Sequence, residues 1–486
     1  MKTAKEAAID CVQAATHAQP VSLVGASASW VPSRFNARSQ APDGTLILYN
    51  SYTGAFSGFP SKLRGQVEAL LHRNGFRGRC EGLTKYLSER GYLVPRGTNE
   101  LQRARLQYGA AQHRSDRLEL ILLSSEECNF RCVYCYETFP RGTMAPWVRE
   151  AVIKMVERRM PTLNSFSADY FGGEPLLGFE AIEEMAPVFK RLADEHHVHH
   201  GSTMTTNGYL LTPERFEKLI QWNVLGYQIT LDGAPADHDQ HRVLKEGGPT
   251  FNVILDNLRA MRTFNAPFRV ALRVNFDPTN LPRIPDFLEA MAEFKHDKRF
   301  VLRFYPVGRW GGTNDDSLQI CGLSGEAQRQ RLDVLAAEQG HNPESRMPYL
   351  KSQNGMNVCY AARPHNLLIG ADGKIMKCTI ALDTKDHNIV GKMTRDGRAE
   401  IDVDKMLKWV APYFEDDTAC KRCFYLPVCQ GCSCPLPRVE TGERPCPPEK
   451  LQIRKTLISV WDVKNRTANR YDLEAQRLRR AETTAR

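Results

Sequence analysis

Between residues 118 and 306 the chain alternates short apolar runs with longer segments in which apolar positions recur every three or four residues. The short runs are typical of buried strands, and the longer segments are typical of amphipathic helices. Strands are predicted over residues 118–125, 168–172, 202–207, 227–232, 269–276 and 300–306. Helices are predicted over residues 146–160, 179–197, 212–222, 251–263 and 284–294. Strands separated by helices predict repeated βα units, and therefore an α/β fold around a parallel sheet.

The order of these elements also predicts where the chemistry lies. Right-handed crossovers between parallel strands would curl the sheet toward a barrel. In parallel barrels, ligands bind at the C-terminal ends of the strands. We therefore look for functional residues directly after each predicted strand.

The first 115 residues follow a different pattern. The turn sequence Pro42-Asp43-Gly44 precedes an apolar run at 45–54, which predicts a hairpin with residues 33–37. Short helices and one apolar stretch follow, at residues 62–72, 82–90 and 91–95. A further helix, over residues 325–337, is expected to bridge the sheet region to the rest of the chain.

Three cysteines follow the first predicted strand. Cys128, Cys132 and Cys135 have a CxxxCxxC spacing, with Tyr134 just before the last of them. Three thiolates can bind three irons of a [4Fe–4S] cube and leave the fourth iron open to a ligand that is not protein. Zinc is the alternative interpretation, but it usually takes four ligands in C-x2-C pairs, and no nearby His or Cys completes such a set.

On this motif the chain resembles the radical S-adenosylmethionine (SAM) superfamily. The resemblance implies a partial (β/α)6 barrel similar to a TIM barrel, with a [4Fe–4S] cluster on the three cysteines and SAM on the open iron. It also implies reductive cleavage of SAM and hydrogen abstraction by a 5′-deoxyadenosyl radical. The protein would supply orientation and a dry pocket for this cofactor chemistry.

Polar residues near the other strand ends match the same family. The candidate SAM-binding residues are Tyr134, Gly172, Gly173, Glu174, Asn207, Thr230, Arg242 and Asn275. In the family the Gly-Gly-Glu motif holds the amino group of SAM, and its glycines let the backbone approach a ligand closely. Thr230 stands where the family has Ser and keeps the hydroxyl. For each residue singly, ordinary hydrogen bonding at a strand end is the alternative role.

Four other residues near these strand ends are expected to pack rather than to act. They are Tyr209, Asp232, Arg303 and Tyr305. The sequence identifies no catalytic base.

Beyond residue 347 the chain is rich in cysteine, in a pattern similar to the SPASM domain with its two auxiliary [4Fe–4S] clusters. By position, one cluster would be held by Cys420, Cys423, Cys429 and Cys446. The other would be held by Cys359 and Cys378 together with Cys432, Cys434 or both. The family has C-x3-C where this chain has Cys432 and Cys434, so the ligand choice stays open. With only three thiolates one iron could bind a substrate thiolate, whereas four would leave only electron transfer. Zinc is an alternative occupant of this region too.

The amino-acid composition favours a globular protein with metal-binding cysteines over a membrane or secreted protein. A hydrophobic fraction of 42% over 486 residues suffices for a large core in several domains. No run of 18 apolar residues occurs, and the charged N-terminus lacks a secretory apolar region. We therefore expect a cytoplasmic protein that does not bind membranes, in which fourteen cysteines indicate metal rather than disulfides.

The net charge of +9 is concentrated at the C-terminus. Residues 448–486 carry ten Lys and Arg against five Asp and Glu. We expect a solvated helix over 451–480, and no nucleic-acid partner, because no nucleic-acid-binding motif accompanies the charge.

Taken together, the motifs predict domains and a function. The predicted domains are a winged-helix-like peptide-recognition region (1–115), the radical SAM partial barrel (116–320), a bridge (321–346), a SPASM-type domain (347–450) and a basic helix (451–486). The resemblance implies a maturase that forms a thioether or carbon–carbon crosslink in a ribosomally made precursor peptide. The N-terminal region would bind the leader of this peptide, and flavodoxin or ferredoxin would supply electrons.

Two alternatives remain open. A sulfatase-maturing enzyme is disfavoured because Thr379 stands where that group has an Asp, and its chemistry needs a placed proton acceptor. A non-catalytic iron–sulfur protein is disfavoured by the intact cysteine and Gly-Gly-Glu motifs.

Overall fold

The computed structural model describes residues 28–72, 74–78, 81–112, 114–344, 350, 359–382, 385–411, 415–431, 434–444 and 446–463. The chain divides into two compact units. The parallel-sheet unit comprises Ser115–Glu344 and Pro364–Trp409. The terminal unit comprises Met1–Arg114, Ser345–Arg363 and Val410–Arg486. Cys432 and the tail from residue 464 onward, two subjects of sequence predictions, lie outside the described residues.

Six parallel strands in chain order build the parallel-sheet unit. They are β7 (Arg117–Leu123), β9 (Ser165–Phe171), β11 (Ser202–Thr206), β12 (Val224–Thr230), β14 (Arg269–Phe276) and β15 (Phe300–Pro306). Each strand pairs in parallel with the next. All six predicted strands are therefore confirmed, with ends displaced by up to three residues.

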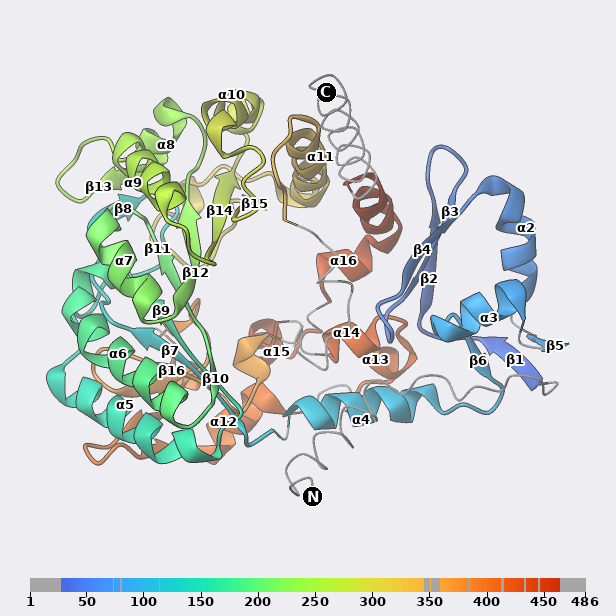
Figure 1. Cartoon of the computed structure of the whole chain (residues 1–486), viewed down its shortest axis with the longest axis horizontal. Coiled ribbons are helices and arrows are strands. Elements are labelled where there is room, and N and C mark those ends of the chain that lie inside the picture. The colour runs from blue at the N-terminus through green and yellow to red at the C-terminus, as the bar shows by residue number, and fades with distance from the viewer. Residues whose placement is uncertain are drawn as a thin grey trace, which may run out of the picture. The chain divides into compact units, whose positions relative to one another are not determined.

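Helices connect these strands and lie along the sheet (Figure 1). They are α5 (Pro146–Arg159), α6 (Phe179–Glu195), α7 (Pro213–Gln221), α9 (Phe251–Thr263) and α10 (Ile284–Ala290). Helix α7 illustrates why these segments are helical. The Thr212 side chain caps its start by accepting a hydrogen bond from the Arg215 N–H, and Phe216 and Leu219 are buried on one face. The predicted α/β class is confirmed, and so is the predicted helix near 325–337, observed as α11 (Gly325–Glu338).

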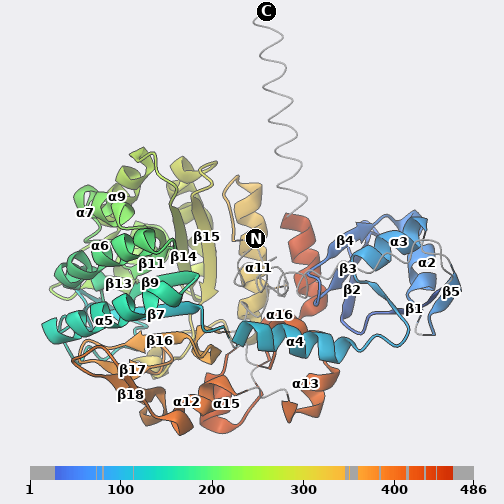
Figure 2. The ribbon, with the colours of Figure 1, turned by 60° about the horizontal axis from the view of Figure 1, so that its bottom comes forward.

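Four short strands from a distant part of the sequence extend this sheet beyond β7 (Figure 2). They are β16 (Asn366–Ile369), β17 (Lys374–Met376), β18 (Ile389–Met393) and β19 (Ala399–Ile401), followed by α12 (Val403–Val410). Strand β16 runs parallel to β7, and the others continue in antiparallel order. The loop between β17 and β18 carries Cys378 in the parallel-sheet unit, whereas the other predicted auxiliary ligands belong to the terminal unit.

The terminal unit contains small antiparallel sheets with short helices. Its strands are β1 (Ala28–Pro32), β2 (Asn36–Gln40), β3 (Leu46–Asn50), β4 (Phe56–Phe59), β5 (Phe76–Gly78) and β6 (Leu93–Pro95). Its helices in this region are α2 (Ser61–Leu70), α3 (Gly82–Glu89) and α4 (Glu100–Gln112). The predicted hairpin forms, but its first strand begins at Asn36 rather than at residue 33. The turn closes between Ala41 and Thr45, so the strand runs directly into it.

Strand β3 joins the two parts of the terminal unit. Leu46 and Leu48 belong to one core with Trp30 and Phe59. Alternate residues of the same strand belong to a second core formed with the cysteine-bearing region, made up of Ala41, Ile47, Tyr49, Leu350, Tyr425, Val428, Leu457 and Val460. This alternation is the side-chain period of a strand with both faces buried.

The cysteine-bearing region of the terminal unit consists of very short helices. They are α13 (Thr418–Arg422), α14 (Leu426–Cys429), α15 (Leu436–Thr441) and α16 (Pro448–Leu451), and residues 453–463 are also helical. The predicted terminal helix over 451–480 is thus present as far as residue 463, where the described part ends. Within the described residues, no helix combines the length and apolar character that crossing a bilayer requires.

Candidate active site and cysteine cavity

A cavity of about 450 Å³ in the parallel-sheet unit collects most of the predicted site residues. Cys128, Cys132 and Cys135 all line it. So do seven of the eight candidate SAM-binding residues, namely Tyr134, Gly172, Gly173, Asn207, Thr230, Arg242 and Asn275. These residues come from segments far apart in sequence, and the parallel strands bring their C-terminal ends together.

The loop that carries the three cysteines is anchored on both sides. Its short strand β8 (Phe130–Cys132) pairs with β13 (Arg242–Leu244), which sets Cys132 opposite Arg242. The backbone N–H of Phe130 donates to the Cys128 sulfur at 3.3 Å. Burial raises the pKa of all three thiols, that of Cys135 to about 12. A metal bound here would therefore have to displace thiol protons, as thiolate ligation requires.

The chemistry of this donor set fits an iron–sulfur cube. Three free thiols line the cavity together with polar residues at the strand ends, and its volume of about 450 Å³ leaves room for a further ligand. A cube binds each cysteine to a different iron, so its ligands are spread more widely than those around one ion. Among the residues that the structure describes, no three Cys, His, Asp or Glu side chains gather closely enough for a single metal ion.

Tyr134 lies at the centre of a buried hydrogen-bond network. Its hydroxyl accepts from Arg242 Nη1 at 2.9 Å and from Asn275 Nδ2 at 3.0 Å, and it donates to Asp232. Asp232 also accepts the backbone N–H of Asn275 at 3.0 Å. Burial raises the pKa of Tyr134, so the phenol keeps its proton. Three residues chosen from sequence as SAM ligands thus contact one another.

Asp232 takes part in this hydrogen-bond network, which the sequence did not predict. It is fully buried and joins β12 to β14 through this network, although we expect from the sequence only packing. Its position in a Leu-Asp-Gly segment directly after a strand is the sequence signal that marks it.

The Gly-Gly-Glu segment supports the cysteine loop from behind. A Cβ on Gly173 would lie 2.6 Å from the Glu127 carbonyl oxygen and 3.0 Å from the Cys128 Cβ. Gly172 has φ +116°, and a Cβ there would lie 2.1 Å from the Ser125 carbonyl oxygen. The observed reason for both glycines is therefore the close passage of the cysteine loop.

Glu174 is the one SAM candidate that does not line the cavity. It is fully buried and accepts from Thr206 Oγ1 at 2.7 Å, Asn207 N at 2.7 Å and Leu176 N at 3.0 Å. Both oxygens are thus engaged by the protein, and they hold the end of β11 in place. Its bond to the amino group of SAM stays a prediction.

The remainder of the cavity wall contains residues that the sequence did not single out as ligands. Arg273 donates through Nε to Asn275 Oδ1 at 2.8 Å, and its guanidinium lies 4.5 Å from the centre of the Tyr305 ring. Tyr305 lines the cavity, contrary to the expectation of packing alone. Thr379, next to Cys378, also lines it.

Glu137 lines the cavity as well, and nothing in the sequence pattern singled it out. Burial and the nearby Glu126 raise the pKa of its carboxyl to about 8. Of the two other residues expected to pack, Tyr209 meets the Phe130 ring edge-on, whereas Arg303 forms an ion pair with Glu344.

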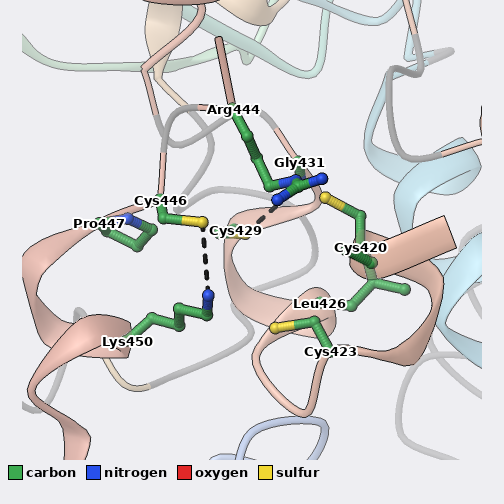
Figure 3. Close-up of a pocket in the computed structure, with 10 residues that line it drawn as sticks. Cys420, Cys423, Leu426, Cys429, Gly431, Arg444, Cys446, Pro447 and Lys450 are labelled. Atoms are coloured by element: carbon green, nitrogen blue, oxygen red, sulfur yellow. Dashed lines mark hydrogen bonds between the residues drawn. The ribbon is translucent and has the colours of Figure 1, made fainter. Parts of the chain in front are cut away.

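A second cavity, of about 40 Å³, lies in the terminal unit (Figure 3). Four of its lining residues are Cys420, Cys423, Cys429 and Cys446, the set assigned by spacing to one auxiliary cluster. Cys420 lies in α13, Cys423 directly follows it, Cys429 ends α14 and Cys446 precedes α16, so four positions within a span of 27 residues line one cavity. Four converging free thiols fit an iron–sulfur cluster.

Nitrogen donors surround these sulfurs. The N–H of Tyr425 donates to the Cys423 sulfur at 3.3 Å, and the N–H of Gly431 donates to the Cys429 sulfur at 3.4 Å. The Lys450 ammonium donates to the Cys446 sulfur at 3.4 Å. Asp417 caps α13 by accepting from the Cys420 N–H at 3.1 Å, and Arg444 holds the pKa of this carboxyl well below its usual range.

The other predicted auxiliary ligands are distributed over both units. Cys359 precedes a 3-10 turn, Tyr360–Ala362, in the terminal unit, and Cys434 is exposed in the same unit. Cys378 is buried in the parallel-sheet unit. Their ligation, with or without Cys432, stays a prediction.

Comparison with known proteins places residues 122–297 in the Radical SAM superfamily. The GTP 3′,8-cyclase of Crocosphaera subtropica is 26% identical over 302 residues, 55% of this chain and 82% of that protein. The cysteine-type anaerobic sulfatase-maturating enzyme of Clostridium novyi is 23% identical over 347 residues, 64% of this chain and 87% of that protein.

Two further similarities extend this picture. The mycofactocin maturase MftC of Mycolicibacterium smegmatis is 27% identical over 285 residues, 56% of this chain and 66% of that protein. A solved structure of anSMEcpe with bound AdoMet has a TM-score of 0.52 at 17% identity and covers 73% of this chain and 96% of that one. This last similarity supports the fold.

Proposed function

The chain belongs to the radical SAM superfamily, and on this premise we propose that it is a maturase of a ribosomally made peptide. The observation that carries the proposal is the single cavity lined by the cysteine triplet and by seven candidate SAM ligands. When bound, the cluster and SAM supply a 5′-deoxyadenosyl radical that removes a hydrogen atom from the substrate.

The residues of the cavity would divide this work. Cys128, Cys132 and Cys135 would bind the [4Fe–4S] cluster. Arg242, Thr230 and Asn275 would hold the carboxylate and ribose of SAM, and Tyr134 would lie beside its adenine. Glu174 and Asp232 would keep the strand ends in position, because both accept backbone N–H groups there.

The four-cysteine cavity supports a SPASM-type arrangement. We propose that Cys420, Cys423, Cys429 and Cys446 bind one auxiliary [4Fe–4S] cluster. Cys359 and Cys378, with Cys432, Cys434 or both, would bind another. Three cubes would give about twelve irons and about twelve sulfides per chain. Quantitation of both after anaerobic reconstitution tests this number.

The cysteine-rich region and the similarity to two maturases favour a peptide substrate over a nucleotide. A sulfatase-maturating enzyme and a mycofactocin maturase are similar to this chain over more than half of its length. We propose an intramolecular thioether or carbon–carbon crosslink as the product. The leader would bind the winged-helix-like part of the terminal unit, and flavodoxin or ferredoxin would be the reductant.

A second candidate function is sulfatase maturation, which similarity to the Clostridium novyi enzyme favours. Thr379 argues against it, because its side chain lines the cavity at the place where that group has an Asp. Thr cannot accept a proton as a carboxylate does at neutral pH.

One anaerobic assay separates these functions. The reconstituted enzyme is incubated with SAM, dithionite and either the short peptides encoded beside its gene or a sulfatase peptide with its target Cys. A crosslinked product lighter by two hydrogens, with 5′-deoxyadenosine, is the expected result. Formylglycine in the sulfatase peptide would instead support the second function. The Cys128→Ala/Cys132→Ala/Cys135→Ala variant should form no 5′-deoxyadenosine, and normal formation by this variant would refute the cluster assignment.

A further inference from the structure

Lys450 is the charged side chain that contacts a sulfur of the four-cysteine cavity. Its Nζ lies 3.4 Å from the Cys446 Sγ, and Figure 3 shows the side chain extended toward that sulfur. Among the contacts of the described residues, the Cys423 sulfur accepts the backbone N–H of Tyr425, and the Cys429 sulfur accepts the backbone N–H of Gly431.

The ionic contacts of Lys450 differ from those of Arg444, the other cation that lines this cavity. Among the described residues Lys450 forms no ion pair, and its side chain is half-buried in the cavity wall. Arg444 also lines this cavity, but its guanidinium is turned to Asp417, to which it donates at 2.7 Å and 3.1 Å and which Arg438 shares at 3.6 Å. Among the described residues, Lys450 is therefore the cation that donates directly to a sulfur of this site and has no carboxylate partner.

We propose that Lys450 is a positioning residue that raises the reduction potential of the cluster bound by Cys420, Cys423, Cys429 and Cys446. The inference rests on the proposed function for the presence of that cluster. Reduction adds one negative charge to the cluster and its thiolates. A cation hydrogen-bonded to a ligand sulfur stabilises the reduced form more than the oxidised form, and hydrogen bonds and net charge are known determinants of cluster potential. Partial burial limits the screening of this charge by salt.

The test is an EPR-monitored redox titration of the reconstituted full-length enzyme, with dithionite as reductant and without substrate. The signal that disappears in a Cys429→Ala/Cys446→Ala variant identifies the cluster at this site. In Lys450→Met we expect the oxidised-to-reduced ratio, measured at the wild-type midpoint, to rise about tenfold. A tenfold change corresponds to a midpoint about 59 mV lower for a one-electron couple.

Two variants control for charge and for structure. Lys450→Arg keeps a cationic donor and should restore most of the wild-type midpoint. Lys455→Met removes one positive charge from an exposed position five residues further on and should leave the midpoint unchanged. Iron and sulfide contents equal to wild type exclude an assembly defect as the cause of the shift.

The other outcomes overturn the inference. An unchanged midpoint in Lys450→Met, with the signal assigned by the cysteine variant, refutes the role of Lys450 and leaves the proposed function intact. If the cysteine variant loses no signal, the site holds no cluster, and the ligand assignment fails together with the inference.

Discussion

At the scale of single residues, motif and structure agree on position more than on role. The sequence correctly directs attention to Gly172, Gly173 and Glu174, which lie behind the cysteine loop. It assigns them to SAM, which stays a prediction, and the structure adds their close approach to Ser125, Glu127 and the end of β11. A motif records which residue types recur, and it does not record which neighbour requires them.

Gly173 yields a test of this support. In Gly173→Ala the new Cβ would lie 2.6 Å from the Glu127 carbonyl oxygen, so the cysteine loop must move. Overpacking of this kind costs about 1–3 kcal/mol. We expect a lower unfolding temperature by calorimetry and less iron in the reconstituted protein.

A matched substitution shows whether the close contact is the cause. A Cβ on Gly201 would meet nothing within 4 Å, so Gly201→Ala should leave both the unfolding temperature and the iron content unchanged. Equal iron content in Gly173→Ala and wild type would contradict the supporting role.

At the scale of elements, long periodic segments were predictable and short ones were not. The six parallel strands from β7 to β15 and the helices α5, α6, α7, α9 and α10 between them repeat their apolar pattern over enough residues to be recognised. Strands β16 to β19 have three to five residues each and carry no such pattern. The cysteine-bearing helices are equally short, so the sequence predicts their ligands through spacing and not through structure.

A buried histidine in one short strand predicts that the stability of the fold depends on pH. Strand β10 (His199–His200) pairs with β9, and the His200 ring stacks on Phe166 with centroids 5.4 Å apart. Burial lowers the pKa of His200 to about 4, from an ordinary value near 6.5. As the pH falls, His200 is protonated in the unfolded chain at a higher pH than in the folded chain. The free energy of unfolding therefore decreases as the pH falls from about 6.5 to about 4.

The size of this effect is bounded by the shift. The free energy of unfolding can decrease by about 3 kcal/mol at most through protonation of His200. His200→Phe keeps the ring stacking but cannot be protonated, so its unfolding temperature should fall less than that of wild type between pH 7 and pH 5. The exposed His196 provides the control, because His196→Gln should retain the wild-type profile. Parallel pH profiles for wild type and His200→Phe would show that His200 does not contribute.

At the scale of the whole molecule, the parallel-sheet unit is built from two separate stretches of sequence. Residues 366–369 of β16 pair with residues 119–122 of β7. Leu120 and Leu122 of β7 are fully buried, so the edge that β16 covers belongs to an apolar strand. The sequence could not reveal this pairing, because its partners lie far apart and one of them is only four residues long.

This pairing predicts how fragments behave. A fragment of residues 115–344 leaves β7 as an open apolar edge strand, and such edges promote aggregation. We expect it to be largely aggregated in size-exclusion chromatography, whereas residues 115–409 should give a monomer peak. A monomeric shorter fragment with the same thermal unfolding as the longer one would show that β16 is dispensable.

Thr379 and Ile380 line the same cavity as Cys128, although about half of the chain's length separates them from it in sequence. During synthesis on the ribosome, the cysteine loop emerges long before the segment that completes its enclosure. A nascent chain therefore lacks the segment that completes this enclosure for about half of its elongation. Delivery of iron and sulfide into a finished pocket has to wait until translation has passed this late segment.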